Sequence, residues 1–394
     1  MKNVFLIKYG ELAIKGKNRP IFENRLVKTV KKNLKVLGNF NVHKEQGRLI
    51  VEPNDEFVDK DAVIEMLTRI FGIIGVAYGT KEEEVTLEAV ERLAYSHMKN
   101  LCEDANGQLT FKIETKRADK RFPLKSMEVS STIGGYLLDE FGDKLKVDVH
   151  NPDVTLMVEI RNGTYVYSKT YKGSGGMPYG TNGKATLLLS GGIDSPVAGW
   201  LIAKRGVEVD AVYFHSPPYT SERAKDKVIE LAKKVAVYTG SMRVHIVPFT
   251  DIQMAIHEKC PHQQLTIIMR RLMMDVTEAI ADKNNSMALI TGESIGQVAS
   301  QTIHGLVATD DAAKRPVFRP LIGMDKEEII QIAKKIDTFE TSILPYEDCC
   351  TIFVPKHPET KPKLDRIIES QSKLDDVIEQ LLQEAIDNTE VVEV

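Results

Sequence analysis

The sequence predicts an α/β protein in which α+β units at the front are followed by a doubly wound parallel sheet. Over residues 3–171, strands, helices and hairpins alternate in a mixed order, whereas after residue 184 short apolar runs alternate with helical patterns. The second pattern is typical of a parallel sheet covered by helices on both faces. The glycine-rich segment from Lys172 to Lys184 separates the two patterns and is predicted to be a linker.

The first unit has the element order β-α-β-β-α-β, which is typical of a ferredoxin-like unit. Its first helix is predicted because Phe22, Leu26 and Val30 recur every four residues. Gln46-Gly47 marks the turn of the predicted hairpin. The predicted elements are a strand over residues 3–9, a helix over 20–36, a hairpin over 40–53, a helix over 59–73 and a strand over 74–78.

A second α/β unit follows, and its clearest element is a hairpin that turns at Asn162-Gly163. Its predicted elements are a helix over residues 85–100, a strand over 108–115, a helix over 126–141 and the hairpin over 154–171.

The back half alternates apolar strands with helices. The predicted strands lie near residues 185–190, 209–215, 243–248 and 286–290. The predicted helices lie near residues 195–205, 221–237, 263–282 and 325–335, with a last acid-rich helix over about 362–386.

Composition favours a cytoplasmic protein with reduced thiols. No stretch approaches the roughly 18 uninterrupted apolar residues of a membrane span, and the N-terminus resembles a first strand rather than a signal peptide. The four cysteines are too few and too irregularly spaced for a secreted disulfide scaffold.

Positive charge is concentrated in the front half, although the net charge is only −4. Residues 1–50 hold 12 Lys/Arg against 3 Asp/Glu, and residues 112–125 hold six against two. Such basic stretches are typical of a surface that binds a polyanion such as RNA, and a solvated helix face is the alternative for residues 18–36. The candidate RNA-binding residues in the second stretch are Lys116, Arg117, Lys120 and Arg121.

The segment "LLLSGGIDSPVAG" (Leu187 to Gly199) is the strongest functional signal. The apolar run predicts a buried strand, Ser190-Gly191-Gly192 the turn that leaves the sheet, and Asp194-Ser195-Pro196 the start of the next helix. Backbone N–H groups at such a helix start favour an anion, and glycines let it approach closely. The motif is neither the usual P-loop nor the dinucleotide G-x-G-x-x-G.

Ser-Gly-Gly-x-Asp-Ser after a strand resembles the PP-loop of the ATP pyrophosphatase superfamily, whose loop holds the pyrophosphate released when a substrate is adenylated. In that superfamily the next strand end holds the adenine, which makes Tyr213 and Phe214 candidates. Other candidates come from later segments. Gly292, Gln297 and Gln301 suit a nucleotide, Arg270 or Arg271 a phosphate, and Lys326 the charge on the transferred group. A surface arginine pair and a solvated lysine are the alternatives.

The adjacent cysteines Cys349 and Cys350 lie in the polar, proline-rich segment "PYEDCCTIFVPKHPETKP". They do not make a zinc or iron–sulfur site alone, and no metal ligand set is predicted. A redox-active or sulfur-carrying thiol on a mobile loop is one interpretation and an inert pair is the other. Cys102 is interpreted as a core residue and Cys260 as inert, with a partner thiol as its alternative.

The chain as a whole resembles the tRNA 4-thiouridine synthetases, the tRNA uracil 4-sulfurtransferase family called ThiI. The resemblance rests on "KYGELAIKGKNR", "KRADKRFP", "LLLSGGIDSPVAG", "FHSPP", "TGESIGQVASQT" and "PYEDCCTIFVPKHP". It implies a ferredoxin-like domain, a THUMP domain that binds tRNA and a PP-loop catalytic domain. Its domain limits would be residues 1–60, 61–166 and 184–394 with a linker over 167–183, whereas periodicity alone favours a first break near residue 80.

The implied reaction makes 4-thiouridine at position eight of tRNA. ATP with Mg²⁺ adenylates O4 of the uridine, and sulfur from a persulfide then replaces that oxygen. The implied donor is a cysteine desulfurase, and many members also pass sulfur to a ThiS-type carrier protein of thiamine synthesis. The resemblance is to a short form without the C-terminal rhodanese domain of some members, which weakens the expectation of a thiamine role.

Matching residue by residue, the family implies roles for the loop, the pocket and the thiols. Asp194 is a candidate catalytic residue of the pyrophosphate loop, and Cys350 matches best the thiol that resolves the sulfur transfer, with Cys349 as the alternative. The candidate ATP-binding residues are Leu188, Leu189, Ser190, Gly191, Gly192, Ser195, Tyr213, Phe214, Arg270, Gly292 and Gln301.

Two other functions stay open from the sequence. One is a PP-loop enzyme that acts on another adenylated substrate, and the other is an RNA-binding protein with an inactive ATP site. The sequence also leaves open whether the chain forms a homodimer.

Overall fold

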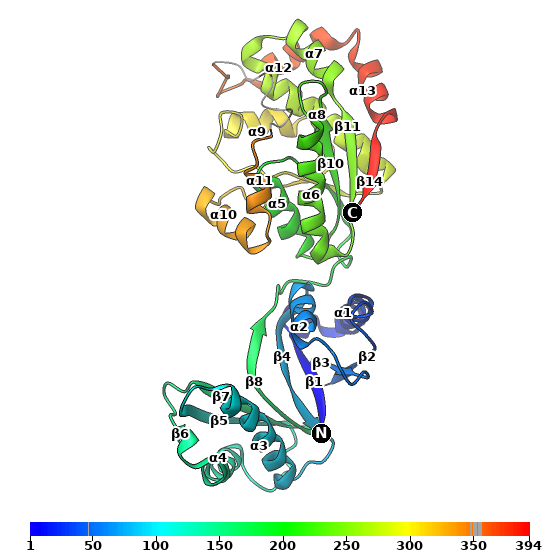
Figure 1. Ribbon diagram of the computed structural model, residues 1–394. Coiled ribbons are helices and arrows are strands. Elements are labelled where there is room, and N and C mark those ends of the chain that lie inside the picture. The colour runs from blue at the N-terminus through cyan, green and yellow to red at the C-terminus, as the bar shows by residue number, and fades with distance from the viewer. Residues whose placement is uncertain (46, 347–348, 350–352, 354–356) are drawn as a thin grey trace. The chain divides into compact units, whose positions relative to one another are not determined.

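The computed structural model describes residues 1–45, 47–346, 349, 353 and 357–394. The chain divides into two compact units, Met1–Gly176 and Met177–Val394, each built around one β-sheet (Figure 1). The division falls within the glycine-rich segment. The finer limits at residues 60 and 166 stay predictions.

The front of the first unit has the predicted β-α-β-β-α-β order. Its strands pair antiparallel in the order β2-β3-β1-β4, and α1 and α2 pack on one face over an apolar core that includes Leu26, Val30 and Leu67. The elements are β1 (Lys2–Tyr9), α1 (Arg19–Leu34), β2 (Phe40–Glu45), β3 (Arg48–Pro53), α2 (Lys60–Arg69) and β4 (Ile73–Glu82). Two short 3-10 turns over Glu11–Ile14 and Gly16–Asn18 lie outside the prediction.

The second half of this unit continues the same sheet. β4 pairs with β8, so the two predicted units share eight strands in the order β2-β3-β1-β4-β8-β7-β5-β6. The sequence does not reveal this sharing, because pairing between distant strands leaves no local pattern. The elements are α3 (Leu87–Asp104), β5 (Leu109–Arg117), α4 (Ser126–Phe141), β6 (Leu145–Val147), β7 (Val154–Ile160) and β8 (Thr164–Lys172).

A buried ion pair joins two strands that are not neighbours in this sheet. Arg48 Nη1 on β3 donates to Glu159 Oε2 on β7 at 2.7 Å, although three strands separate β3 from β7 in the sheet. Both side chains are almost fully buried, and Tyr167 also donates to Glu159, at 2.6 Å. Neighbouring strands lie about 4.8 Å apart, so in a flat sheet β3 and β7 would be too far apart for this contact. The sheet must therefore curve strongly.

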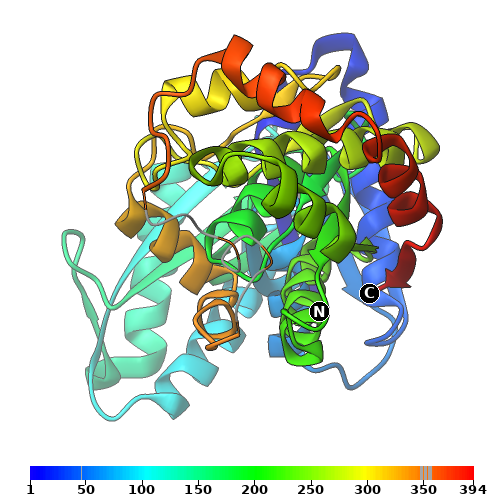
Figure 2. The same cartoon turned by 90° about the horizontal axis from the view of Figure 1, so that it is seen from above.

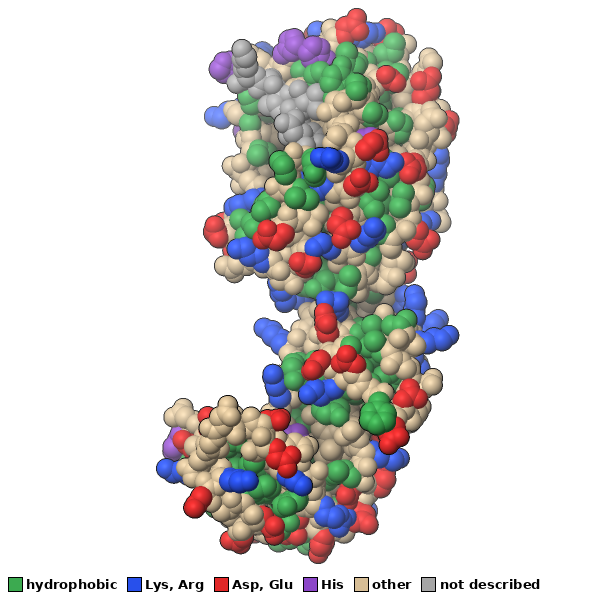
Figure 3. Space-filling model, viewed as in Figure 1, with side chains coloured by type: hydrophobic (Ala, Val, Ile, Leu, Met, Phe, Trp, Pro, Cys, Tyr) green, Lys and Arg blue, Asp and Glu red, His purple; other side chains and the backbone are tan. Residues whose placement is uncertain are grey.

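Lysines cover the outer face of α1. Lys28, Lys31, Lys32 and Lys35 are exposed, whereas Glu23, the acid of this helix, is buried against Tyr9 and Arg19. Figure 3 shows Lys and Arg side chains gathered at this edge of the unit. The basic stretch of the sequence is therefore a basic surface.

The second unit has a six-stranded sheet in the order β13-β12-β9-β10-β11-β14. The four predicted strands are parallel, and two short edge strands, β13 (Val317–Phe318) and the antiparallel β14 (Glu390–Glu393), were not predicted. The remaining strands are β9 (Lys184–Leu188), β10 (Glu208–His215), β11 (Arg243–Pro248) and β12 (Ala288–Ile290).

Helices cover both faces of this sheet, as predicted. One face carries α5, α6 and α10, and the other carries α7, α8, α9 and the C-terminal helices (Figure 2). These helices are α5 (Asp194–Ala203), α6 (Glu222–Thr239), α7 (Thr250–Lys259), α8 (Leu265–Lys283), α9 (Ile303–Asp310), α10 (Lys326–Lys335), α11 (Phe339–Ser342), α12 (Leu364–Gln371) and α13 (Ile378–Asp387).

The prediction of one last helix over residues 362–386 is wrong. A 3-10 turn over Ser372–Leu374 and a break before Ile378 divide this stretch, and Leu374 is fully buried at the break. The break arises because α12 and α13 pack separately on α8 and α9. A continuous amphipathic pattern does not predict such a break, since tertiary packing can override local preference.

Candidate active site

The strand–turn–helix unit at β9 and α5 forms as the sequence predicts. β9 ends at Leu188 and α5 begins at Asp194, with Pro196 in its first turn. The serines of the loop hold its shape, since Ser195 Oγ accepts from Ser190 N at 2.9 Å and Ser190 Oγ accepts from Gly192 N at 3.3 Å. The start of α5 faces the carboxyl edge of the sheet, where a helix dipole favours negative charge.

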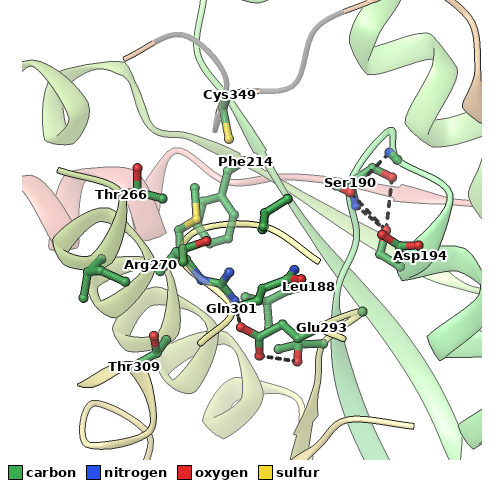
Figure 4. Close-up of a pocket in the computed structure, with 18 of the residues that line it drawn as sticks. Leu188, Ser190, Asp194, Phe214, Thr266, Arg270, Glu293, Gln301, Thr309 and Cys349 are labelled. Atoms are coloured by element: carbon green, nitrogen blue, oxygen red, sulfur yellow. Dashed lines mark hydrogen bonds and ion pairs between the residues drawn. The ribbon is translucent and has the colours of Figure 1, made fainter. Parts of the chain in front are cut away.

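This loop borders a cavity of about 460 Å³, a size that suits a nucleotide. The cavity lies at the point where the chain order reverses between β9 and β12, which is where doubly wound sheets bind ligands. It is lined by ten of the candidate ATP-binding residues together with two of the candidate catalytic ones (Figure 4). These are Leu188, Leu189, Ser190, Gly192, Ser195, Tyr213, Phe214, Arg270, Gly292 and Gln301, with Asp194 and Cys349. Gly191 belongs to the loop but not to the lining.

One wall of the cavity is apolar. Leu188 and Phe214 come from the ends of neighbouring strands, and Met273 faces them from α8. Phe214 is fixed edge-on against Phe249, with ring centroids 4.8 Å apart. Such a wall suits the flat face of a heteroaromatic base.

Gly292 lets the chain after β12 touch the start of α5. A Cβ atom at this position would lie 2.7 Å from Ser195 N and 2.8 Å from Asp194 C. Both are backbone atoms that cannot turn away, so any side chain here would push the loop and β12 apart. The glycine is therefore required by close approach at the cavity.

A buried carboxylate holds Arg270 at the cavity. Arg270 forms an ion pair with Glu293, whose other oxygen accepts from Arg319 at 2.7 Å. Burial raises the pKa of Glu293, but Arg270 and Arg319 outweigh that effect and bring its pKa below the usual value. Arg270 is thus a fixed cation beside the space where an anionic ligand would lie (Figure 4).

Arg271 has a different position from Arg270. It is buried, donates to the Ala308 carbonyl and pairs with Asp311 at 2.9 Å. The alternative of a surface arginine pair therefore does not describe this part of α8, because neither side chain is solvated.

Asp194 and Lys326 form an ion pair next to the loop. Lys326 Nζ donates to Asp194 Oδ1 at 2.6 Å, and Gln297 Nε2 donates to Asp194 Oδ2 at 2.7 Å. Lys326 does not line the cavity, and 41% of its side chain is exposed. Lys326 contacts the loop through its ion pair with Asp194. The alternative interpretation of Lys326 as a merely solvated lysine therefore does not hold.

Cys349 lies in the wall of the cavity. It is only 5% exposed and packs among apolar residues that include Phe249 and Met269 (Figure 4). Cys350 lies outside the described residues. Cys260 is buried and its thiol donates to the Ser370 carbonyl at 3.4 Å, while burial raises the pKa of both Cys260 and Cys102. The buried position of Cys260 is in line with its inert interpretation, whereas Cys102 is only partly buried and packs against the apolar core rather than within it.

The candidate RNA-binding residues belong to the first unit. Lys116 and Lys120 are exposed, and Arg121 is exposed but bound to Asp119 at 2.7 Å. Arg117 donates to the Phe122 carbonyl at 2.9 Å and so supports the loop that follows β5. Three of the four side chains therefore face solvent, and Arg117 has a structural contact.

Sequence reasoning missed several residues of the cavity. Thr266, Glu293 and Thr309 line it, and Arg319 supports Glu293. Glu293 falls in the segment "TGES", where an acid directly after the glycine is a weak signal. No local pattern marks Arg319, because it meets Glu293 only in the folded chain.

Among the described residues, no group of three or more His, Cys, Asp or Glu side chains is placed to hold a metal ion. None of the helices in the described part of the chain has the length and apolarity that a membrane crossing needs.

The fold and the site define a THUMP-containing protein with a PP-loop-type α/β domain. Residues 4–77 match the ThiI ferredoxin-like domain, residues 84–169 the THUMP domain and residues 180–375 the family described as thiamine biosynthesis protein (ThiI). The chain is 55% identical to the probable tRNA sulfurtransferase of Acetivibrio thermocellus over 392 residues, which cover 100% of this chain and 99% of that protein. The protein of the same name from Agathobacter rectalis is also 55% identical, over 393 residues. The chain belongs to the ThiI family of tRNA sulfurtransferases.

A solved structure shares the whole architecture. The crystal structure of a 4-thiouridine synthetase–RNA complex with bound ATP superposes with a TM-score of 0.90 at 38% identity, covering 100% of both chains. A protein of solved structure from Pyrococcus horikoshii is 24% identical with a TM-score of 0.66 over 85% of this chain, and shares the fold.

Proposed function

We propose that this chain uses ATP to adenylate O4 of uridine eight in tRNA and then replaces that oxygen with sulfur to give 4-thiouridine. The observation that carries the proposal is one cavity that unites the loop of Ser190 to Ser195, the fixed cation Arg270 and the thiol-bearing residue Cys349. The relative with bound ATP and RNA supports the choice of nucleotide and of substrate class.

The cavity supports a definite orientation of ATP. Its apolar wall at Leu188 and Phe214 suits the adenine, and the loop at the start of α5 suits the pyrophosphate that leaves. Arg270 would then stabilise charge on the phosphates, because Glu293 already holds its guanidinium in place.

The first chemical step forms one bond and breaks one. Uridine O4 attacks the α-phosphorus of ATP, the bond to the β-phosphate oxygen breaks, and pyrophosphate leaves. The loop, together with Asp194 and its partner Lys326, lies where negative charge on the leaving group develops. The Mg²⁺ that accompanies ATP would be bound mainly by the phosphates, since Mg²⁺ in such sites uses only one or two carboxylates. Asp194, the acidic residue in the first turn of α5, would be the protein carboxylate available to it.

The second step exchanges oxygen for sulfur. The terminal sulfur of a persulfide bonds to C4, and AMP departs with the former O4. A second thiol, as its thiolate, then attacks the carrier sulfur. The S–S bond to the transferred sulfur breaks, 4-thiouridine is released, and a disulfide forms between the two thiols. Cys350 and Cys349 are the candidates for these two thiols, and Cys349 lines the cavity in which the adenylate would form. A cysteine desulfurase is the proposed donor of the persulfide sulfur. A ThiS-type carrier would be a second acceptor only if the same persulfide were offered to it.

The first unit would bind the tRNA. The exposed lysines of α1 and the exposed Lys116 and Lys120 form basic surfaces that fit a phosphate backbone. Recognition of a folded RNA by shape and backbone requires few base contacts, which agrees with surfaces made mainly of lysine.

Mass spectrometry of nucleosides tests the proposal. Unmodified tRNA is incubated with the protein, ATP, Mg²⁺ and either free sulfide or a desulfurase with cysteine. The expected result is a 4-thiouridine peak, which the Asp194→Ala variant loses while it still binds tRNA. If neither sulfur source gives the peak although tRNA binds, the chain acts on another adenylated substrate or only binds RNA.

A further inference from the structure

Side chains outside the cavity contact the described residues on both sides of Cys349 and the backbone of Cys349 itself. Residues 344–353 are termed the cysteine segment here, and residues 344–346, 349 and 353 of it are described. Three separate contacts fix these described residues to the helices and loops at the carboxyl edge of the sheet.

Lys227 on α6 holds the beginning of the cysteine segment. Its Nζ donates to the Leu344 carbonyl at 2.9 Å and lies 3.5 Å from the Tyr346 carbonyl. Lys227 is only 6% exposed, which is unusual for a lysine, since this residue is almost never fully buried unless its ammonium group is bound. A buried ammonium directed at backbone carbonyls has the function of fixing that backbone.

Gln253 on α7 holds the middle of the segment. Its Nε2 donates to the Cys349 carbonyl at 2.9 Å, and the residue is 2% exposed. The same nitrogen lies 3.2 Å from Met269 Sδ on α8. Since Met269 belongs to the apolar cluster that also contains Cys349, this contact ties the cysteine backbone to the core beside the cavity.

Phe353 anchors the end of the segment. Its ring lies 5.4 Å from that of Tyr219, in the loop after β10, and 5.1 Å from that of His257 on α7. The described residues of the segment are thus fixed at its beginning, middle and end by three different elements.

We propose that Lys227 and Gln253 are positioning residues for the sulfur-transfer step. They hold the backbone at Leu344, Tyr346 and Cys349, so that the Cys349 side chain stays in the wall of the cavity in which the adenylated base would lie. The proposal rests on the proposed function for its chemistry. A reacting group held in one place reacts faster than one that must find its partner.

The test uses Lys227→Met and Gln253→Met in the full chain. Both remove a donor while they keep much of the side-chain volume. Lys234→Met is the matched control, since Lys234 lies on the same helix α6 and donates to a backbone carbonyl at 2.7 Å, but to that of Asp337 outside the cysteine segment. Lys227→Arg, which retains a cationic donor, serves as the conservative variant if Lys227→Met folds poorly.

The first measurement is the rate at which iodoacetamide labels Cys349, followed by peptide mass spectrometry with Cys102 as the internal reference. Faster labelling of Cys349 is expected in Lys227→Met and Gln253→Met, and an unchanged rate in Lys234→Met. This measurement needs neither tRNA nor ATP, so it tests the positioning even if the proposed function fails.

The second measurement separates the two steps of the reaction. Lys227→Met and Gln253→Met are expected to slow desulfurase-driven formation of 4-thiouridine by about 10- to 100-fold, with the KM for ATP and the exchange of pyrophosphate into ATP unchanged. Lys227→Arg is expected to recover part of the rate. Unchanged labelling and unchanged thiolation would overturn the proposal, and so would a parallel loss of ATP binding, which would show that both residues only support the nucleotide cavity.

Discussion

Lys326 Nζ lies 2.6 Å from Asp194 Oδ1, which joins the first residue of α10 to the first residue of α5. Two helix starts therefore converge on one ion pair at the edge of the loop from Ser190 to Ser195. Gln297 holds the other oxygen of Asp194 at 2.7 Å, so the carboxylate is fixed from both sides.

Removing the cation of this pair should slow adenylation more than it weakens ATP binding. Lys326→Met leaves Asp194 attached to Gln297 but removes a positive charge from the place where pyrophosphate would leave in the proposed reaction, so a loss of about 10²-fold in kcat is expected. Lys334→Met on the same helix is the control, since Lys334 lies over the Phe339 ring away from the loop. Exchange of labelled pyrophosphate into ATP measures the adenylation step. Equal rates in both variants would show that Lys326 does not contribute to this step.

Adding one methyl group to Gly292 should damage the nucleotide site. The new Cβ atom would lie 2.7 Å from Ser195 N, so the loop or β12 must move, and overpacking of this kind costs about 1–3 kcal/mol. Gly292→Ala is therefore expected to raise the Kd for ATP by about tenfold or more. In Gly323→Ala, the matched control, the new Cβ atom meets nothing within 4 Å. Calorimetric titration with ATP compares the two, and similar affinities would show that the close approach is dispensable.

The exposed lysines after β5 should contribute to tRNA binding through the phosphate backbone. Each of Lys116→Ala and Lys120→Ala is expected to reduce the slope of log Kd against log salt by about 1. Lys146→Ala provides the control, because Lys146 is also exposed in the first unit but lies on β6 outside the basic segment. Filter binding at several salt concentrations measures the slope. An affinity that does not respond to salt would contradict backbone recognition.

The first unit should lose stability in mild acid through His97. Burial lowers the pKa of His97 to about 4, and its Nε2 lies 2.9 Å from Ser168 Oγ. Because the unfolded chain binds the proton near pH 6.5 and the folded chain does not, the stability is complete above that pH and is lost as the pH falls toward 4. The loss from this group is about 3 kcal/mol at most.

His97→Gln cannot take up that proton and should lack this part of the acid sensitivity. Urea unfolding at pH 4.5 and pH 7.5 measures the difference for both proteins. An equal loss of stability in the variant and the native protein would show that other groups cause it.

The sequence could predict the elements that local patterns determine. The strand–turn–helix at Leu187 to Gly199 formed as expected because an apolar run, glycines and a proline each have a strong local preference. The ten candidate ATP-binding residues that line the cavity were named through the family resemblance. Those that follow parallel strands gather there because such strands end at the same edge of a sheet.

Features that depend on distant contacts were not predictable. The pairing of β4 with β8, the Arg48–Glu159 ion pair and the support of Glu293 by Arg319 each join residues far apart in the sequence. The buried position of Lys227 is a further case, because a lysine in an amphipathic helix ordinarily predicts a solvated side chain.

The most direct test of the proposed reaction follows the oxygen that sulfur replaces. Transfer RNA carrying ¹⁸O at O4 of uridine eight is converted in a single turnover, and the AMP product is analysed by mass spectrometry. Adenylation of the base predicts that the label appears in the phosphate of AMP together with formation of 4-thiouridine. Unlabelled AMP formed alongside 4-thiouridine would contradict the central claim, because O4 would then have left without ever being bonded to phosphorus.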